Sequence, residues 1–501
     1  MLPHPTRLKE MPIMADITAY TKQQADQLLA GKYSKPAEGV PKSDLASGVQ
    51  ASLEKADAAL TKTDADATYV KAITPEMFGA AGDGTTNDQA ALQAMFDAAG
   101  GKIVWLAGTY AHNGILTISA SGVTIDGPGT LLATAEQTSS VLVSGAYCTM
   151  RRVTIKMQST TQRYTEYEKM KVRVTGDHFY ADRITIDGSA ASGVYLAAGW
   201  AMFLGCVIKD TRADGIFTSE GSHDVTVLAC TAINTGDDGF SVVSYSNPGP
   251  VQRYTNVGCK VINGGARGFS CVGGTDVTFA SFFVNGCQSA ALYVGGEGDG
   301  FANIARVNFV GGEIINANQN ASTDHGALHV TAWGTRSVTQ VSFSGLTIRN
   351  TRSEASAQLR VIRYDNSTIT DVLLSGITLI DGPGTLVNLH QVTAAGNRIY
   401  LANVLRNGID ITARQVFTSY GALTLDGAST KYVVFMASGG SAPVLPTAVG
   451  NVSVYRFKNT GAANATISTT SSQTIDGAAT LTLSPGNAVD IESDGDNWRT
   501  F

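Results

Sequence analysis

Two adjacent carboxylates flanked by glycines are the residues of this chain best suited to chemistry. Asp237 and Asp238 lie in Asn234-Thr-Gly-Asp-Asp-Gly-Phe240, directly after a short apolar run. Cleavage of a glycosidic bond uses two carboxyl groups, about 5 Å apart in retaining enzymes and about 6.5–9.5 Å apart in inverting ones. Carboxylates this close raise the pKa of one of them, which keeps it protonated as a proton donor. The motif therefore predicts acid–base chemistry.

The same pattern occurs one repeat earlier and one repeat later. Apolar runs also precede Asp210-Thr-Arg-Ala-Asp-Gly215 and Asn263-Gly-Gly-Ala-Arg-Gly268. Four residues after the first residue of each of the three motifs lie Asp214, Asp238 and Arg267. If the runs are neighbouring strands about 4.8 Å apart, these side chains form one column. The two column aspartates and Asp237 are predicted to be catalytic; the alternative is that they only shape and cap turns.

The elements that would position this column are short strands separated by turns. Apolar runs rich in Val, Ile, Phe and Thr end in Asn or Asp at spacings of 24, 29, 22, 31, 34 and 31 residues. The run ends are Asp210, Asn234, Asn263, Asn285, Asn316, Asn350 and Asp381. A constant strand signature with variable spacing is typical of a parallel β-helix, whose loops absorb the differences in length. We predict an all-β fold: a right-handed single-stranded parallel β-helix with a short helical N-terminal stalk and a C-terminal β-sandwich module.

The composition agrees with a solenoid and argues against other classes. The chain has 501 residues, 54 of them Gly, with 43% hydrophobic and only 16% charged residues. It has no apolar segment of about 18 residues, so we expect no transmembrane helix and no membrane partner. The net charge of −6, without a basic aromatic face, argues against a nucleic-acid partner. We see no cluster with metal-ligand spacing and expect no cofactor.

The six cysteines point to packing rather than to disulfides. They show no C-x-x-C pair, and Cys206, Cys230 and Cys259 recur at similar places in three successive repeats. This pattern predicts a stack of small buried side chains inside the solenoid. Free thiols also suggest assembly in a reducing compartment.

The two ends of the chain differ from the repeats and define the predicted domains. Residues 1–72 form a polar stalk region, residues 73–415 the β-helix, and residues 416–501 a β-rich module. The stalk has a 4-3-4 spacing of Val49, Leu53, Ala56 and Leu60. That spacing suits a short coiled coil or an amphipathic surface helix equally well. The first 13 residues lack the pattern of a signal peptide, and Met14 is a plausible alternative start.

Three segments resemble parts of known proteins. Residues 41–60 resemble the stalks of bacteriophage tail fibres and tailspikes. Residues 73–92 resemble the first coil of pectate-lyase-like β-helices, where a strand, a Gly-Asp-Gly turn and a capping helix close the solenoid. Residues 416–501 resemble C-terminal modules of phage tail proteins, which trimerise or bind carbohydrate. The resemblance implies a homotrimeric virion protein, made in the bacterial cytoplasm without a signal peptide and joined to a phage tail or baseplate protein through its N-terminal region.

Residues 200–295 resemble the active-site region of the polygalacturonases, β-helix glycosidases that hydrolyse pectin. Asp214-Gly-Ile216 matches the first catalytic aspartate of that family, and Thr235-Gly-Asp-Asp-Gly239 matches its Asp-Asp pair. The resemblance implies inverting hydrolysis, in which Asp238 protonates the leaving oxygen while Asp214 and Asp237 activate water. Spacing alone does not decide which member of the adjacent pair is the acid.

The chain departs from that family where the family binds its acidic sugar. Ala266-Arg-Gly-Phe-Ser270 replaces a Gly-His-Gly element, and Ala291-Leu-Tyr293 replaces an Arg-Ile-Lys element. The substrate is therefore not expected to be polygalacturonate. Arg267 either binds an acidic group of another sugar or forms a salt bridge that holds Asp238.

Further polar and aromatic residues lie along the same face and are candidates for substrate binding. Tyr293 and Trp333 could stack on sugar rings. Glu297 and Asp324 could form a rival carboxylate pair, and His325 lies beside them in the sequence. Together with Arg267, these residues form the predicted substrate-binding set, although each could equally be ordinary surface or turn.

The preferred interpretation is an endo-acting glycoside hydrolase. We expect a phage tailspike that binds and hydrolyses a bacterial surface polysaccharide, either capsule or O-antigen. One alternative is a polysaccharide lyase that uses Arg267 and Tyr293 for β-elimination. The other is a receptor-binding tail protein without catalytic activity.

Overall fold

The computed structural model describes residues 43, 45–57, 72–384, 387–390, 399–412, 414–419, 421–425, 431–470 and 472–501. The chain divides into two units, Met1–Val70 and Lys71–Phe501. In the first unit, α2 (Ser47–Asp57) contains Val49 and Leu53, both of which are exposed. The helical nature of this segment is confirmed, and the coiled coil remains a prediction. Leu60, Met14 and the first 13 residues lie outside the described residues.

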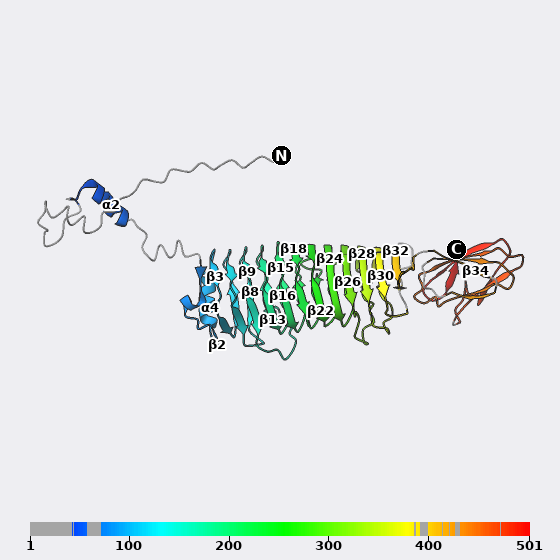
Figure 1. The fold of residues 1–501 in the computed structure, drawn as a ribbon, viewed down its shortest axis with the longest axis horizontal. Coiled ribbons are helices and arrows are strands. Elements are labelled where there is room, and N and C mark those ends of the chain that lie inside the picture. The colour runs from blue at the N-terminus through cyan, green and yellow to red at the C-terminus, as the bar shows by residue number, and fades with distance from the viewer. Residues whose placement is uncertain are drawn as a thin grey trace, which may run out of the picture. The chain divides into compact units, whose positions relative to one another are not determined.

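The second unit contains a parallel β-solenoid in which the strands stack in chain order (Figure 1). One coil consists of β15 (Met202–Leu204), β16 (Val207–Thr211) and β17 (Ile216–Thr218). The next coil consists of β18 (His223–Leu228), β19 (Thr231–Ile233) and β20 (Phe240–Val243), and each strand pairs in parallel with its counterpart. We call these three positions the first, second and third strips of the solenoid. The predicted β-helix is confirmed.

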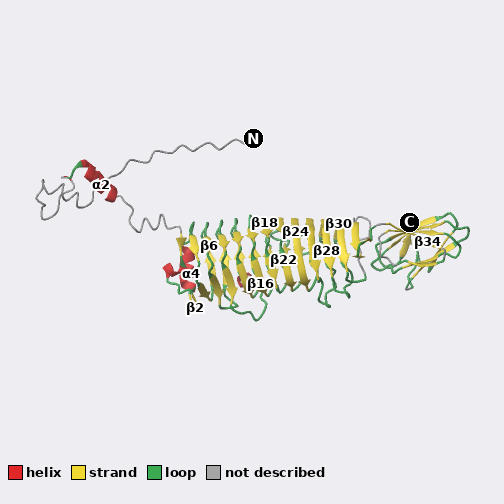
Figure 2. Ribbon diagram, viewed as in Figure 1, coloured by secondary structure: helices red, strands yellow, loops and turns green. Residues whose placement is uncertain are grey.

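The remaining strands of the solenoid repeat this arrangement (Figure 2). The first strip also holds β3 (Ile103–Trp105), β6 (Thr124–Asp126), β9 (Thr149–Arg151), β12 (Tyr180–Asp182) and β21 (Gln252–Val257). The second strip holds β4 (Thr109–His112), β7 (Thr130–Ala133), β10 (Thr154–Met157), β13 (Thr185–Ser189) and β22 (Lys260–Gly264). Longer strands then span both strips: β24 (Gly274–Cys287), β26 (Ile304–Ile315), β28 (Ser337–Arg349), β30 (Thr368–Ile380) and β32 (Ile399–Arg406), after which β33 (Ile409–Asp410) pairs with β32. The third strip is an 11-stranded sheet that adds β5 (Ile115–Ile118), β8 (Ser140–Val143), β11 (Val172–Val174), β14 (Val194–Leu196), β23 (Phe269–Val272), β25 (Leu292–Glu297), β27 (Leu328–Trp333), β29 (Leu359–Arg363) and β31 (Val387–His390).

The turn between the second and third strips explains the recurring Asn and Asp. Six of the seven predicted run ends have a positive φ, between 51° and 57°. Asn and Asp tolerate this left-handed conformation better than other residues with a side chain. Asn234 Nδ2 donates to Asp210 Oδ1 at 2.9 Å, and Asn263 Nδ2 donates to Asn234 Oδ1 at 3.1 Å. The exception is Asn285, where the following Gly286 takes the positive φ of 80°.

The interior of the solenoid is apolar, and the cysteines are part of it. All six are free and buried. The backbone N–H of Cys206 points at Cys230 Sγ, and that of Cys230 points at Cys259 Sγ, both at 3.3 Å. The predicted stack of buried thiols is confirmed, and the reducing compartment remains a prediction.

The first coil is closed by a short helix. After β1 (Ala72–Ile73), the 3₁₀ helix η2 (Pro75–Phe78) and β2 (Asp83–Asn87), α4 (Gln89–Asp97) buries Leu92, Met95 and Phe96 completely. Asp88 lies at the start of α4, but its carboxylate accepts hydrogen bonds from the N–H groups of Ala81 and Gly82 at 2.7 and 3.1 Å. The acidic residue therefore shapes the Gly-Asp-Gly turn.

The C-terminal module consists of two sheets around one core that includes Tyr432, Phe457 and Trp498. One sheet is β34 (Arg414–Ser419), β36 (Lys431–Met436), β38 (Val454–Asn459), β41 (Ala488–Ser493) and β42 (Trp498–Thr500). The other is β35 (Ala422–Thr424), β37 (Ala442–Leu445), β39 (Ala465–Thr469) and β40 (Thr480–Leu483). The module is two-layered as expected, but its first strands pair in parallel, as in the solenoid, before the pairing becomes antiparallel. Among the helices described, none has the length and apolar character needed to cross a membrane.

Asn316 offers a test of the turn column away from the site described below. It has a φ of 56°, and its Nδ2 donates to Asn285 Oδ1 at 3.0 Å. Asn316→Ala should lower the stability of the solenoid by about 1–2 kcal/mol, because alanine strains the left-handed backbone and removes the hydrogen bond. Asn316→Gly keeps the backbone relaxed and should cost less. Thermal unfolding followed by circular dichroism gives both values, and equal losses would refute the role of φ.

Candidate functional site

The predicted column forms at the start of β17 and β20, where the chain enters the third strip. The N–H of Gly215 donates to the carbonyl of Asp238 at 2.9 Å, and the N–H of Gly239 donates to the carbonyl of Arg267 at 3.0 Å. The backbone N–H of Asp238 also donates to Asp214 Oδ1 at 3.0 Å. These bonds place Asp214, Asp238 and Arg267 on three successive coils, as the spacing predicts.

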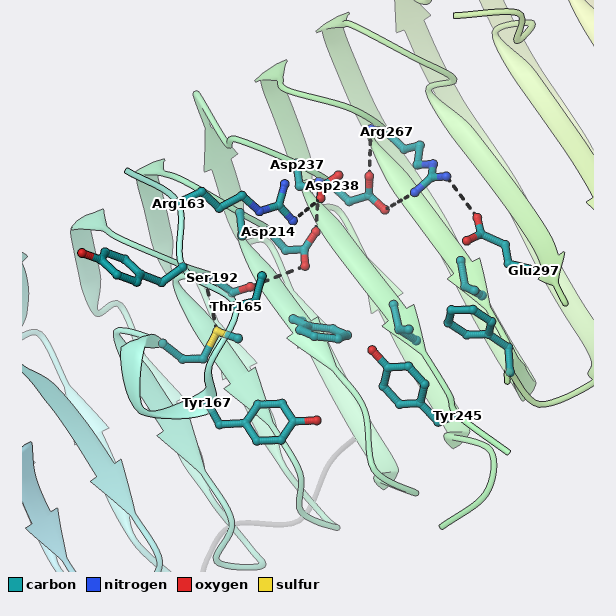
Figure 3. Close-up of a pocket in the computed structure, with 17 residues that line it drawn as sticks. Arg163, Thr165, Tyr167, Ser192, Asp214, Asp237, Asp238, Tyr245, Arg267 and Glu297 are labelled. Carbon is teal, nitrogen blue, oxygen red and sulfur yellow. Dashed lines mark hydrogen bonds and ion pairs between the residues drawn. The ribbon is translucent and has the colours of Figure 1, made fainter. Parts of the chain in front are cut away.

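Three carboxyl groups meet at this column. Asp214, Asp237 and Asp238 each contribute one oxygen to a group whose members all lie within 4.8 Å of one another. Figure 3 shows the three carboxyls side by side, between Arg163 on one side and Arg267 on the other. The predicted catalytic residues are therefore close enough to share a substrate.

Asp214 is the one carboxyl of the three that, among the described residues, has no arginine at ion-pair distance. Besides the N–H of Asp238, its only close donor in the described structure is the Ser192 hydroxyl, at 3.4 Å from Oδ2. Burial raises the pKa of Asp214 well above its ordinary value, and the charges of Asp238 and Asp237 raise it further. Asp214 is thus protonated under conditions where an ordinary aspartate is ionised.

Asp238 is more deeply buried and better held, at 3% exposure. Its carboxylate accepts hydrogen bonds from the N–H of Arg267 at 2.9 Å and from the Ser270 hydroxyl at 2.5 Å. Burial raises the pKa of Asp238 to about 6, although the positive charge of Arg267 opposes the rise. The carboxyl is anchored by donors on two sides, which suits a positioning role.

Arg267 contacts three neighbouring side chains. Its Nη2 lies 3.0 Å from Glu297 Oε1, its Nη1 lies 3.7 Å from Asp238 Oδ2, and its guanidinium stacks 4.1 Å from the centre of the Tyr293 ring. Of the two alternatives for this residue, the geometry favours the salt bridge.

A long loop supplies residues that sequence reasoning missed. The segment 158–171 connects β10 to β11 and includes the 3₁₀ turn η3 (Tyr167–Lys169). Arg163 Nη2 on this loop contacts Asp237 Oδ2 at 2.6 Å, although 74 residues separate the two. Arg212 holds the loop by donating to the hydroxyl and carbonyl of Thr160 at 2.9 and 2.6 Å. The available signal was Arg163-Tyr-Thr-Glu-Tyr-Glu-Lys169, a charged and aromatic run in a chain with few charges.

Aromatic side chains complete the walls of a cavity of about 330 Å³ in front of the carboxyls. Tyr167 comes from the long loop, and Tyr245 stacks on Phe301 with ring centres 5.3 Å apart. Phe217 of β17 lies in the wall as well. In Figure 3 the rings of Tyr167 and Tyr245 lie on the same side of the carboxyl row, with their hydroxyls directed toward the space between them. The cavity is of the size and mixed character typical of small-ligand sites.

Most of the predicted substrate-binding residues lie elsewhere. Tyr293 is only 2% exposed, and one ring face is covered by Arg267, so the prediction that it stacks on a sugar is wrong. Arg267 and Glu297 line the cavity, whereas Asp324, His325 and Trp333 do not. Asp324 instead pairs with Arg360 at 2.6 Å, and Glu297 accepts hydrogen bonds from Arg267 and Tyr293, so these two acids do not act as a pair.

The three carboxyl oxygens could be considered as cation ligands. Two of the aspartates already face arginines, Asp237 at Arg163 and Asp238 at Arg267. The arginines compensate two of the three carboxyl charges, and the raised pKa of Asp214 favours its neutral form, so we assign no metal to the cluster.

Comparison with known proteins agrees with this architecture. Residues 76–293, which include the whole carboxyl column, match the sequence model of the family described as Rhamnogalacturonase A/epimerase, pectate lyase-like. The match and the fold support a polysaccharide-processing β-solenoid. No curated protein matches the chain significantly in sequence.

Solved structures share the fold at low sequence identity. The catalytic domain of Agl-KA is 17% identical with a TM-score of 0.51, over 78% of this chain and 67% of that domain. The catalytic unit of a thermostable GH87 alpha-1,3-glucanase from Streptomyces thermodiastaticus strain HF3-3 is 15% identical with a TM-score of 0.52, over 68% of this chain and 69% of that unit. These likenesses show a common solenoid fold.

The raised pKa of Asp214 predicts a stability change of definite sign. An aspartate with a raised pKa in the folded state destabilises the fold at any pH above its unfolded pKa of about 3.9, because ionisation costs more in the folded state. Asp214→Asn should therefore raise the unfolding temperature at pH 7. The gain should disappear below about pH 3, where Asp214 of the wild type is protonated in both the folded and the unfolded state. A variant that is less stable than the wild type at pH 7 would contradict the assignment.

Proposed function

We propose that this protein is a glycoside hydrolase that cleaves a polysaccharide at the carboxyl column. The observation that carries the proposal is the convergence of Asp214, Asp237 and Asp238 within 4.8 Å at one wall of an open cavity. Acid–base cleavage of a glycosidic bond requires two carboxyl groups in different protonation states, one protonated and one ionised.

The surroundings of the carboxyls support a division of roles among them. Asp214, with its raised pKa and few donors, provides the proton for the leaving oxygen. Asp237, paired with Arg163, provides the carboxylate that activates water. Asp238 holds the column together and keeps a negative charge beside Asp214, so this assignment moves the proton donor away from Asp238, where the family resemblance placed it.

The short separation of the carboxyls leaves a second route to consider. Carboxyl groups about 5 Å apart suit retaining enzymes, in which one of them attacks the sugar directly. Asp237 is our candidate for that attack, since Oδ2 contacts Arg163 and its other oxygen has no hydrogen bond to the described residues. The anomeric form of the first product, read by NMR, distinguishes the two routes.

The biological setting is part of the proposal. The stalk and the C-terminal module resemble phage tail proteins, so we propose an endo-acting tailspike that degrades capsule or O-antigen. In this setting the chain forms a homotrimer in the virion and is joined to a phage tail or baseplate protein through its N-terminal region.

Hydrolysis is preferred to β-elimination because of the state of Tyr293. A lyase needs a free base, and the Tyr293 hydroxyl donates to Glu297 Oε1 at 2.7 Å. Burial raises the pKa of Tyr293 well above its ordinary value, which makes its phenolate inaccessible. Arg267, the other proposed lyase residue, is held by Glu297 and Asp238.

Asp214→Asn and Asp237→Asn should each reduce depolymerisation by about 10²–10⁴-fold, because each removes one partner of acid–base catalysis. The measurement is release of reducing ends from a panel of bacterial surface polysaccharides. Asp210→Asn is the matched control, since Asp210 is an exposed residue of the same coil outside the cavity. Products that absorb in the ultraviolet through a new double bond would show elimination, and full activity in Asp214→Asn would remove the proposed centre.

The pH dependence of kcat/KM should follow the ionisation of Asp214. Activity falls when Asp214 ionises, and the negative charge of Asp238 is one cause of its raised pKa. Asp238→Asn should therefore move the alkaline limb of kcat/KM to lower pH, while its amide oxygen can still accept the N–H of Arg267. An unchanged limb, or one that moves to higher pH, would exclude Asp214 as the donor.

A further inference from the structure

A ladder of aromatic rings follows the corner between the third strip and the first strip. Tyr147 stacks on His178 with ring centres 4.3 Å apart, and His178 stacks on Trp200 at 4.9 Å. The His223 ring meets Trp200 edge-on at 4.5 Å. The first three rings are carried by residues with φ of 50–61°, the same left-handed turn on three successive coils. The ladder is separate from the carboxyl column, which lies at the other end of the third-strip strands.

Each coil contributes one residue to this corner, and we call each such position a rung. The two rungs before Tyr147 are glycines and carry no side chain. Gly122 donates its N–H to the carbonyl of Ala146, just as Tyr147 donates to Asp177, so Gly122 occupies the preceding rung of the same column. Gly101, which donates to Ser121, occupies the rung before that. A Cβ at Gly122 would meet only backbone atoms of Gly101, the nearest at 3.6 Å, and one at Gly101 would meet nothing within 4 Å. The ladder therefore ends in an open rung.

The terminal ring is exposed at this open end. Tyr147 is 62% exposed, even though His178 stacks against one of its faces. Trp200, further along the ladder, is 50% exposed. The ladder rings lie one coil apart, and among the described residues no ring stands beside Tyr147 at the level of Gly122.

The turn itself does not require aromatic residues. Further along the same column the residues are Asp224, Arg253, Asp276 and Arg306. These side chains pair with one another, Arg253 with Asp224 at 2.7 Å and Arg306 with Asp276 at 2.5 Å. From Asp224 onward the side chains of this column form ion pairs with one another. At Tyr147, by contrast, His178 covers one ring face and no ring of the described residues stacks on the other.

We propose that the free face of Tyr147, at the empty rung of Gly122, is a second carbohydrate-binding site that stacks one pyranose ring. The C–H face of a pyranose is apolar and suits the electron-rich face of an aromatic ring. The choice of a sugar as ligand rests on the proposed function, since a polysaccharide is the ligand that this protein would meet repeatedly. The site holds substrate and takes no part in bond cleavage.

Two opposite substitutions test the site. Tyr147→Ala removes the platform, and Gly122→Asn fills the empty rung with a side chain that has no ring face and that tolerates the φ of 69° at this position. The probes are the methyl pyranosides of glucose, galactose, N-acetylglucosamine and rhamnose at millimolar concentration, observed by saturation-transfer NMR. Transfer to the C–H protons of at least one sugar should fall about fivefold in both variants. Asp276→Ala is the matched control in the same column and should leave it unchanged.

The outcomes separate this site from the catalytic proposal. Transfer should persist in Asp214→Asn, and both ladder variants should keep their depolymerising activity per enzyme on short fragments. No transfer in the wild type, or equal transfer in the wild type, Tyr147→Ala and Gly122→Asn, would overturn the second site whatever the activity shows. A change of oligomeric state in Tyr147→Ala, measured by light scattering, would also overturn it, because the ring would then serve contact between copies of the chain.

Discussion

The register between neighbouring coils is the constraint on which the rest of this structure depends. Each parallel strand is hydrogen-bonded to its counterparts in the coils before and after it, so a side chain at a given position meets its equivalent about 4.8 Å away. The N–H of Gly215 bonds to Asp238 and that of Gly239 bonds to Arg267, which leaves the column side chains no freedom to separate. Like charges are thereby brought together in a buried place; burial raises the pKa of Asp214, and the charges of Asp238 and Asp237 raise it further.

The close approach of these carboxyls is stabilised by hydrogen-bond donors from the same column. The backbone N–H of each coil points at the carboxyl of the previous one, from Asp238 to Asp214 and from Arg267 to Asp238. Arg267 and Ser270 add further donors to Asp238, so the deeper carboxyl can be ionised while Asp214 keeps its proton. One register therefore brings together a carboxyl that keeps its proton and a neighbour that can carry a negative charge.

The periodic part of this arrangement could be read from the sequence, and the rest could not. Left-handed Asp210, Asn234 and Asn263 mark the end of the second-strip strand in three successive coils, which is why counting four residues onward located the column. Arg163 and Tyr245 were missed because they belong to loops whose lengths vary from coil to coil and follow no period. Tyr293 was misjudged for a related reason: strand alternation places it on the outer face, but Arg267 from the preceding coil covers it. Periodicity gives the direction of a side chain and says nothing about what lies over it.

The two corners that flank the third strip make different use of the same left-handed turn. At one corner the turn is followed by the carboxyls, and at the other it carries rings. The two proposed sites lie at opposite ends of the third-strip strands and on different coils, each coil adding about 4.8 Å. If both proposals hold, one extended glycan of several sugars would be needed to reach from the ring of Tyr147 to the carboxyl column. A solenoid suits this division because each corner can change residue by residue without altering the register that aligns the other.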